Sequence, residues 1–342
     1  MRNCAVRRSS SRVGFILTAA LVLACSGSCL AQALEGVNLA GPAFAPQNLP
    51  GVYGSDYVYP NDAEVAYFTA KGMNVYRISV LWERLQPALD GPFDRDEIGR
   101  LTALVADIHK HGGTAVIDVH NYGAYRGVQI GQNPVTIASF ADLWIRLAHI
   151  FGNSDYVMFG LMNEPQLQQT SEWQQIVQQT IDAIRGAGAT NRILVSGINW
   201  DAAYSFAEVS GNSLGNLADP LHRLVFEVHQ YFDSDSSGTH EACIGPDEAV
   251  RRLGAFTRWL RLDRHQGFLG EFGVSRRAEC LTALDRVTAY LQANSDVWLG
   301  WTYWAAGPRW GEYMYTLEPA AGQDRPQMLV LEKYLRPASQ KN

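Results

Sequence analysis

Eight short apolar runs alternate along the chain with longer stretches of helical pattern, and this alternation most restricts the possible folds. The runs are rich in β-branched and aromatic residues and lie at 36–40, 75–81, 114–119, 156–161, 193–198, 224–228, 267–270 and 298–303. Helix-like stretches between them include 100–111, 137–151, 171–186, 246–260 and 281–294. Eight strand–helix units predict an α/β fold, a closed parallel (β/α)8 TIM barrel rather than an open sheet.

The first 33 residues have a different pattern. Four arginines precede an apolar run at 13–25, and small residues with the triplet Ala31-Gln32-Ala33 follow it. This is typical of a secretory signal peptide, and the run is shorter than the roughly 20 residues that span a bilayer. We therefore expect a signal peptide over 1–33 and a secreted, extracellular chain. Lipid anchoring through Cys25, or a periplasmic location during export, is the alternative, although Leu23 is bulkier than such sites usually show.

Removal of this leader changes the charge and leaves a domain-sized chain. The full chain has 28 basic and 34 acidic residues, a net charge of −6, and loss of the four leader arginines makes it about −10. Such a charge disfavours nucleic acid and anionic membranes as partners and is compatible with a neutral substrate. Residues 34–342 fit one barrel and contain no linker or repeat, so we expect a single catalytic domain and a monomer.

The five cysteines divide in the same way. Cys4, Cys25 and Cys29 belong to the leader, so the mature chain keeps only Cys243 and Cys280. An even pair in an exported protein predicts one disulfide between them.

Two glutamates stand at the ends of strand-like runs. Glu164 lies in Met162-Asn-Glu-Pro165 after the fourth run, and Glu271 lies in Gly270-Glu-Phe-Gly273 after the seventh. Barrel enzymes build their active sites at these C-terminal ends. Glycoside hydrolysis needs two carboxylates, one to protonate the leaving oxygen and one to meet the oxocarbenium-like carbon. Taken singly, Glu164 could instead cap a helix and Glu271 could pair with Arg77 structurally.

Polar or aromatic residues end most of the other runs as well. They are Arg77, His120, Asn163, Trp200, His229, Tyr231 and Trp304. One such residue is unremarkable, but residues at successive strand ends of a barrel converge on one cleft. A core position satisfied by hydrogen bonds is the alternative for the two histidines.

Metal binding is the competing chemistry for some of these residues. Asp118 and His120 share one face of a strand, but the three-ligand, His-rich spacing of a catalytic zinc site is missing. Asp201 and the segment 233–240 contain possible calcium ligands, but they lack the glycine and terminal glutamate of an EF-hand. We expect no metal or cofactor, Asp118 supporting its strand or a histidine, and a polar cleft wall at 233–240.

Seven short motifs, in this order and at barrel spacing, resemble the secreted endo-β-1,4-glucanases (cellulases) of glycoside hydrolase family 5. The resemblance covers about 34–337, and the motifs are Gly36-Val-Asn-Leu-Ala-Gly41, Tyr76-Arg-Ile78, Asp118-Val-His-Asn-Tyr122, Leu161-Met-Asn-Glu-Pro165, His229-Gln-Tyr231, Gly270-Glu-Phe-Gly273 and Thr302-Tyr-Trp-Ala-Ala-Gly307. In the clan that contains this family, the acid and the nucleophile follow the fourth and seventh barrel strands.

The resemblance implies a role for each group. Glu164 would be the general acid and then the base, and Glu271 the nucleophile of a retaining double displacement. Arg77 would hold the nucleophile ionised, Asn163 would bond the sugar 2-hydroxyl, and Tyr231 would hydrogen-bond Glu271.

Histidines and tryptophans would complete the site. His120 and His229 would bond substrate hydroxyls or the catalytic carboxyls, and Trp304 would form the floor under the sugar. Because indole faces pack well on pyranose rings, the tryptophans just past strands are expected to be further platforms. These are Trp82, Trp200 and Trp310. Tryptophans inside helices or strands are expected to be packing residues: Trp144, Trp173, Trp259, Trp298 and Trp301.

The expected activity is therefore hydrolysis of internal β-1,4-glucosidic bonds of cellulose and related β-glucans, with net retention. The closest alternative is the same mechanism on mannan, xyloglucan or mixed-linkage glucan. A glycan-binding protein that has lost catalysis is a further alternative, and the presence of both glutamates argues against it.

Overall fold

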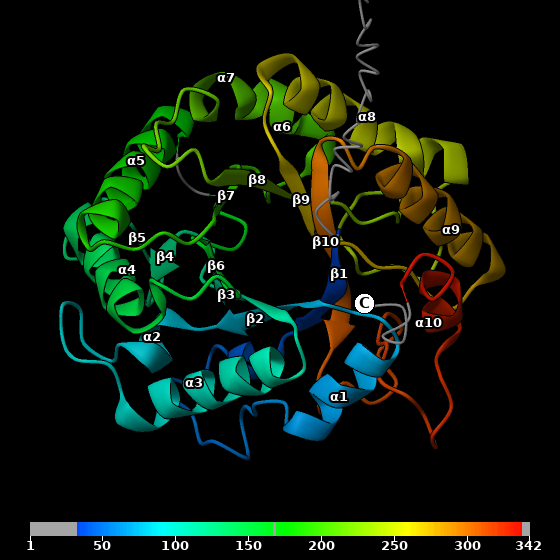
Figure 1. The fold of residues 1–342 in the computed structure, drawn as a ribbon, viewed down its shortest axis with the longest axis horizontal. Coiled ribbons are helices and arrows are strands. Elements are labelled where there is room, and N and C mark those ends of the chain that lie inside the picture. Colours follow the sequence, from blue (N-terminus) through cyan, green and yellow to red (C-terminus); the bar gives the residue numbers. More distant parts are fainter. Residues whose placement is uncertain (1–32, 167–168, 337–342) are drawn as a thin grey trace, which may run out of the picture. The chain divides into compact units, whose positions relative to one another are not determined.

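Among the residues described by the computed structural model, 33–166 and 169–336, eight parallel strands close into a barrel (Figure 1). They are β1 (Leu34–Leu39), β2 (Val75–Val80), β3 (Thr114–Val119), β6 (Val157–Gly160), β7 (Ile193–Ser196), β8 (Leu224–His229), β9 (Gly267–Glu271) and β10 (Trp298–Ala306). β10 pairs in parallel with β1 and closes the ring. The predicted TIM barrel is confirmed, and so is each predicted strand. Apart from Ala33, the predicted leader lies outside the described residues.

Helices follow the strands and form the outer ring (Figure 1). The described ones are α1 (Asp62–Ala70), α2 (Trp82–Leu85), α3 (Arg95–Lys110), α4 (Ile137–Phe151), α5 (Thr170–Gly186), α6 (Ala203–Val209), α7 (Gly211–Leu214), α8 (Pro246–Asp263), α9 (Ala278–Ala293) and α10 (Pro326–Leu331). α3 begins earlier than predicted because Asp94 caps it, accepting hydrogen bonds from the backbone N–H groups of Asp96 and Glu97. No described helix is long and apolar enough to cross a membrane.

Short elements interrupt the loops on the C-terminal side of the strands. A 3-10 turn, η1 (Gly41–Ala43), follows β1, and the two-stranded hairpin of β4 (Ala124–Tyr125) and β5 (Val128–Gln129) follows β3. The sequence did not predict this hairpin, because two-residue strands leave no periodic pattern.

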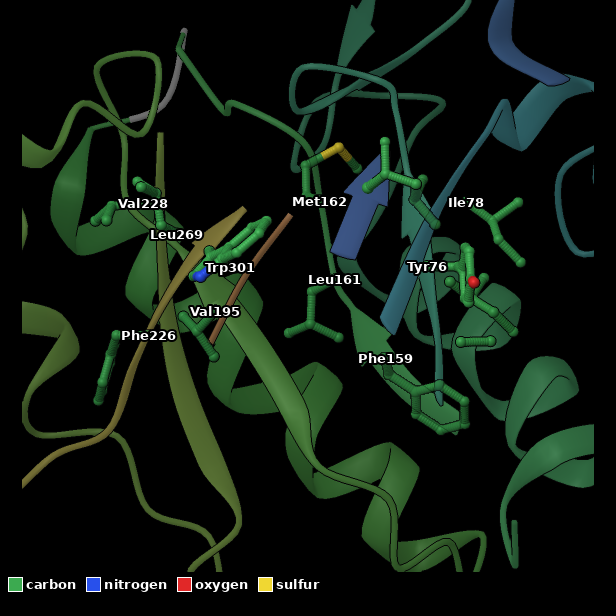
Figure 2. Packing of buried hydrophobic residues seen from close by; sticks show 14 of the residues in the cluster. Tyr76, Ile78, Phe159, Leu161, Met162, Val195, Phe226, Val228, Leu269 and Trp301 are labelled. Atoms are coloured by element: carbon green, nitrogen blue, oxygen red, sulfur yellow. The ribbon is translucent and has the colours of Figure 1, made fainter. Parts of the chain in front are cut away.

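The main core lies between the barrel and its helices (Figure 2). Phe159 of β6 packs against Trp144 of α4, and Phe226 of β8 packs against Trp259 of α8. All five tryptophans that were expected to be packing residues are buried, which confirms that prediction.

A second, smaller core fills the barrel itself. Each barrel strand contributes one apolar residue to it: Leu34, Val75, Val116, Met158, Leu194, Val225, Phe268 and Leu299. Side chains alternate along a strand, so the residue two positions further on also faces inward. Several of these next positions are polar and fully buried, namely Arg77, Asp118, Ser196 and Glu227. The barrel therefore changes from apolar to charged toward the C-terminal ends of its strands.

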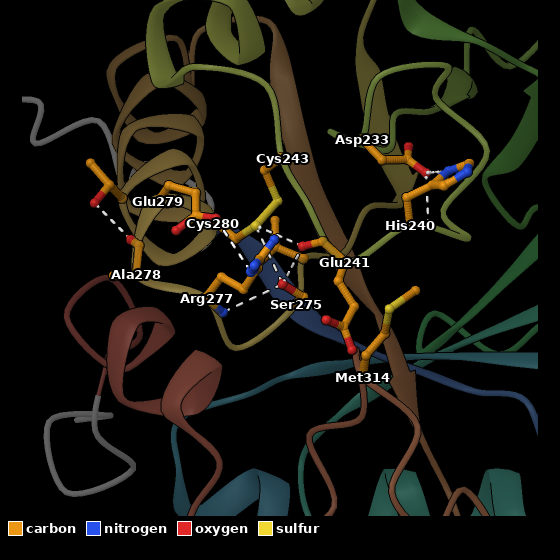
Figure 3. Close-up of a disulfide and its surroundings, with 12 residues drawn as sticks. Asp233, His240, Glu241, Cys243, Ser275, Arg277, Ala278, Glu279, Cys280 and Met314 are labelled. Atoms are coloured by element: carbon orange, nitrogen blue, oxygen red, sulfur yellow. Dashed lines mark hydrogen bonds and ion pairs between the residues drawn. A yellow bond between two sulfur atoms is a disulfide. The ribbon is translucent and has the colours of Figure 1, made fainter.

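Cys243 and Cys280 form a disulfide, as predicted (Figure 3). Cys243 lies in the loop between β8 and α8, and Cys280 lies in the first turn of α9, with their Cα atoms 5.3 Å apart. Beside the bond, the Ser275 hydroxyl donates to the backbone carbonyl of Glu241 at 2.6 Å. The bond thus joins the loop after β8 to the segment after β9, both at the C-terminal ends of the strands.

Candidate active site

Arg77 lies at the centre of the charged layer and contacts three carboxylates. Its guanidinium nitrogens are 3.1 Å from Asp118, 2.8 Å from Glu227 and 2.8 Å from Glu271. It also donates to the Oδ1 atoms of Asn38 and Asn163, at 2.9 Å each. Burial alone would lower the pKa of Arg77, but the three carboxylates outweigh burial and raise it. Arg77 is thus a permanent buried cation fixed on several sides.

Glu271 reaches this layer through an irregularity in the barrel. Phe268 faces inward, so strict alternation would turn Glu271 outward. The register of β8 and β9 shifts, however: Val228 pairs with Leu269, whereas His229 pairs with Glu271. This bulge-like shift turns the Glu271 carboxylate toward Arg77, as such irregularities often do beside functional sites.

Two donors and the surrounding charges hold Glu271 as an anion. Arg77 donates to its Oε1 at 2.8 Å, and the Tyr231 hydroxyl donates to its Oε2 at 2.8 Å. Burial would raise the pKa of Glu271, but the charges of His229, Arg77 and His120 and the bond from Tyr231 lower it below the ordinary value. The contacts expected for Arg77 and Tyr231 are present.

Glu164 lies just beyond β6 and opposite Glu271. It has a left-handed backbone (φ 42°), and its side chain is only 14% exposed. One ligand atom each of Glu164, His229 and Glu271 lie within 4.8 Å of one another, so the two carboxylates face each other closely. This spacing resembles the ~5–5.5 Å of retaining glycosidases and is shorter than the ~6.5–9.5 Å of inverting ones.

His229, at the end of β8, links the carboxylates. Its Nδ1 lies 2.7 Å from Oε1 of Glu164, and its Nε2 lies 3.5 Å from Oε1 of Glu227. Burial lowers the pKa of His229, but Glu271, Glu164 and Glu227 together raise it well above the ordinary value. The three carboxylates around the ring therefore favour its protonated form.

His120, at the end of β3, has a similar support. Its Nδ1 lies 2.8 Å from Oδ2 of Asp118, as expected for a histidine held by that aspartate. The ring stacks on Trp304, with centroids 5.7 Å apart and planes 14° apart, and Nε2 lies 3.4 Å from the Tyr122 hydroxyl. His120 and Trp304 thus form one rigid wall.

A cleft of about 750 Å³ opens over these groups. It exposes Glu164, Glu271, His120 and His229, and its walls include the segment 235–239, which confirms the expected cleft wall. Its aromatic lining consists of Tyr122, Trp200, Tyr204, Tyr231, Trp304 and Tyr313. A second hollow of about 650 Å³ shares His120 and Tyr122 with it and reaches Glu83 and Arg126. The site is an open groove.

Two of the four expected tryptophan platforms, Trp200 and Trp304, line the cleft. Trp310 lines a smaller hollow of about 260 Å³ that shares His120, Tyr122 and Trp304 with the cleft. Trp200 is 50% exposed, and Trp310 lies beside Trp304 with ring centroids 5.8 Å apart. The prediction for Trp82 is wrong. Its side chain is fully buried, and its indole N–H donates to Gln86 at 2.8 Å. The chain turns into α2 directly after β2, so the ring points into the layer between barrel and helices.

Two groups of possible metal ligands occur among the described residues. The first is Glu164, His229 and Glu271. The Glu271 carboxylate already accepts hydrogen bonds from Arg77 and Tyr231, and Glu164 is hydrogen-bonded to His229. The second is Asp233, Asp235 and His240, where the Asp233 carboxylate accepts backbone N–H groups of Gly238, Thr239 and His240 at 3.0–3.2 Å. In both groups hydrogen bonds within the protein occupy the ligand atoms.

Glu227 and Asn38 are parts of the site that the sequence analysis missed. Both are fully buried and contact Arg77. Glu227 could have been found from the alternation Val225, Glu227, His229, because a charge between two other inward positions of a strand must also face the barrel axis.

A β/α barrel with two closely facing carboxylates in an open aromatic groove defines the class of a glycoside hydrolase. The cellulase model, glycosyl hydrolase family 5, matches residues 35–307. The chain belongs to this family.

Relatives and solved structures agree. Endo-β-1,4-glucanase B of Aspergillus niger is 37% identical over 302 residues, 88% of this chain and 89% of the relative. An endo-β-1,4-glucanase structure from Xanthomonas axonopodis pv. citri has a TM-score of 0.87 at 42% identity, covering 89% of this chain and 99% of that one. The structure of XacCel5A in complex with cellopentaose has the same score and identity over 88% of this chain and 99% of that chain.

Proposed function

We propose that this chain is a retaining endo-β-1,4-glucanase in which Glu271 is the nucleophile and Glu164 is the acid and base. The observation that carries this proposal is the pair of facing carboxylates, of which Glu271 is held as an anion by Arg77 and Tyr231. A nucleophile must be ionised, and the lowered pKa of Glu271 meets this requirement.

In the first step, a Glu271 oxygen attacks the anomeric carbon while Glu164 gives its proton to the glycosidic oxygen. The bond to the leaving sugar breaks and a glycosyl ester with Glu271 forms. The negative charge left on Glu164 lies 2.7 Å from the Nδ1 atom of His229, where an N–H group of the ring can donate a hydrogen bond to it. In the second step, Glu164 takes a proton from water, the water oxygen bonds to the anomeric carbon, and Glu271 is released as an anion.

The surrounding groups position the sugar. Asn163 accepts from Arg77 through its Oδ1, which directs its buried Nδ2, unpaired among the described residues, to donate to the 2-hydroxyl. The wall of His120 and Trp304 would support the sugar at the cleavage point, and Trp200 and Trp310 would stack on sugars further along.

The substrate assignment rests on the groove and on the relatives. An open groove with several aromatic residues suits a long neutral chain and cleavage at internal bonds. Relatives at 35–39% identity are named endo-β-1,4-glucanases, and XacCel5A was solved with cellopentaose. The proposed partner is therefore a β-1,4-glucan, and no nucleic acid or membrane partner is proposed.

Initial rates on a matched panel of soluble β-glycans test the activity. We expect carboxymethylcellulose to lose viscosity rapidly, oligosaccharides rather than glucose as products, and a β-anomer as the first product in proton NMR spectra. Higher rates on mannan or xyloglucan would replace the cellulase assignment by that polysaccharide. Binding without turnover would indicate a glycan-binding protein.

We further propose that residues 1–33 are a signal peptide and that the enzyme acts outside the cell. The support is the arginine-rich, apolar and small-residue pattern of this segment. N-terminal sequencing of the exported protein should give Leu34 as the first residue. A diacylglycerol-modified Cys25 at the N-terminus would show lipid anchoring instead.

A further inference from the structure

The loop that presents Trp200 to the cleft has an unusual backbone. Asn199, Trp200 and Asp201 have φ values of 63°, 58° and 53°, so three successive residues other than glycine are left-handed. This conformation brings Cβ too close to the next carbonyl oxygen, and L-residues adopt it singly rather than in runs. Such a turn persists only where its surroundings hold it.

Asp201 supplies most of the contacts that hold this turn. Its side chain is fully buried, and its Oδ1 accepts the backbone N–H of Gly197 at 2.6 Å. Its backbone carbonyl accepts the N–H of His229 at 2.8 Å, and Ala202 forms a β-bridge with His229. Asp201 therefore ties the turn to the ends of β7 and β8.

The exposed side of the turn has a weaker support. The Asn199 side chain donates to the Ser205 hydroxyl at 3.0 Å. Between these two anchors Trp200 is 50% exposed, and its ring lies edge-on to Tyr122 with centroids 6.0 Å apart. The ring thus has a free face toward the cleft, while its backbone is fixed.

We propose that Asp201 is a positioning residue that holds the left-handed turn and thereby fixes the Trp200 indole as a platform for the glucan chain. This inference rests on the proposed function. The backbone N–H of His229 donates to the Asp201 carbonyl, and the His229 ring contacts Glu164. The same residue therefore contacts both the turn that carries the platform and the acid. A platform fixed before binding loses less conformational freedom when the sugar stacks on it.

Asparagine is the conservative replacement for Asp201. Its second oxygen, Oδ2, is buried and has no hydrogen-bond partner among the described residues. Burial raises the pKa of Asp201 well above its ordinary value, which favours the neutral carboxyl. Asp201→Asn keeps a neutral group with an acceptor for Gly197, whereas Asp201→Ala removes the acceptor.

A double-mutant cycle on cellopentaose binding tests this proposal, with calorimetry in a Glu164→Gln background to prevent turnover. We expect Trp200→Ala and Asp201→Ala each to weaken binding roughly five- to tenfold, as the loss of one stacked ring would. Asp201→Asn should stay within about twofold of the parent, and Asp201→Ala should add less than about twofold to Trp200→Ala. In otherwise unmodified enzyme, Asp201→Ala should raise KM more than it lowers kcat.

The outcomes separate this inference from the proposed function. Failure of the parent to bind cellopentaose would contradict the proposed substrate. The positioning role is wrong if Trp200→Ala weakens binding but Asp201→Ala does not. It is also wrong if Asp201→Ala weakens binding by the same factor in the presence and in the absence of Trp200. If Asp201→Ala does not fold, Asp201→Ser decides, because its shorter side chain loosens the bond to Gly197. It should weaken binding only when Trp200 is present, and binding equal to that of Asp201→Asn overturns the proposal.

Discussion

Gly270 lies directly against the Glu227 carboxylate inside the barrel. A methyl group at its Cβ position would come within 2.0 Å of Oε1 of Glu227. The absence of a side chain at Gly270 thus makes room for the carboxylate that contacts both Arg77 and His229. The residue before the candidate nucleophile is therefore a glycine for a steric reason: any larger side chain would collide with Glu227.

Gly270→Ala should therefore damage the site and the fold together. Glu227 must move, which loosens Arg77 and costs roughly 1–3 kcal/mol of stability, as overpacking usually does. We expect a lower melting temperature and kcat/KM reduced at least tenfold, from thermal unfolding and initial rates.

Gly99→Ala is the matched control, because Gly99 lies in α3 and its Cβ would meet nothing within 4 Å. It should retain full activity and be slightly more stable, since alanine favours a helix. Unchanged activity of Gly270→Ala would show that Glu227 has room to move.

Replacement of the two glutamates by alanine should change the activity in different ways. Glu271→Ala removes the nucleophile, so turnover should stop, and azide should then yield a glycosyl azide of inverted configuration. Glu164→Ala should keep comparatively good activity on aryl glycosides with acidic leaving groups, which need little protonation. Glu208→Ala, at an exposed position of α6, serves as the control. Exchanged phenotypes would reverse the two roles.

The acidic limb of the pH profile should report the ionisation of Glu271. Burial raises the pKa of this group, but His229, Arg77, His120 and the hydrogen bond from Tyr231 lower it. Since a lowered pKa favours the ionised form, the contribution of Glu271 to stability is present above its unfolded pKa of about 4.3 and is lost as the pH falls through the folded value.

Tyr231→Phe removes one stabilising bond, so the acidic limb of kcat/KM should move to higher pH. Tyr204→Phe is the comparison, because Tyr204 also lines the cleft but forms no hydrogen bond with Glu271 in the described part of the chain. An unmoved limb in Tyr231→Phe would mean that the limb reports another group.

The disulfide should contribute to stability more than to turnover. Cys243 and Cys280 are 37 residues apart, and the chain-entropy model gives about 4 kcal/mol for closing such a loop. Reduction, or the double change Cys243→Ser with Cys280→Ser, should lower the melting temperature while kcat stays within about threefold. The double variant should not respond to reductant. Equal melting temperatures before and after complete reduction would contradict this prediction.

The strands and the strand-end residues could be predicted because periodicity and chain order determine them. The disulfide could be predicted because only two of the five cysteines lie outside the predicted leader, which leaves one pairing. The direction of Glu271 could not, since it depends on the shifted register between β8 and β9. Glu227 was overlooked inside an apolar run, where its charge is balanced by Arg77 from a distant strand. Pairing across the barrel is not visible in a linear pattern.

Trp82 and Trp200 show the same limit: both were expected to be sugar platforms, but only Trp200 is exposed, and this difference gives the last prediction. Both follow a strand, yet Trp82 packs against Tyr125 and Phe140 while Trp200 faces the cleft. Trp82→Phe should lower the melting temperature and leave KM for cellopentaose unchanged, because it alters only buried packing and the bond to Gln86. Trp200→Ala should raise KM and leave the melting temperature within about 1–2 °C, since exposed positions contribute little to stability. A raised KM in Trp82→Phe at full stability would return Trp82 to the substrate site.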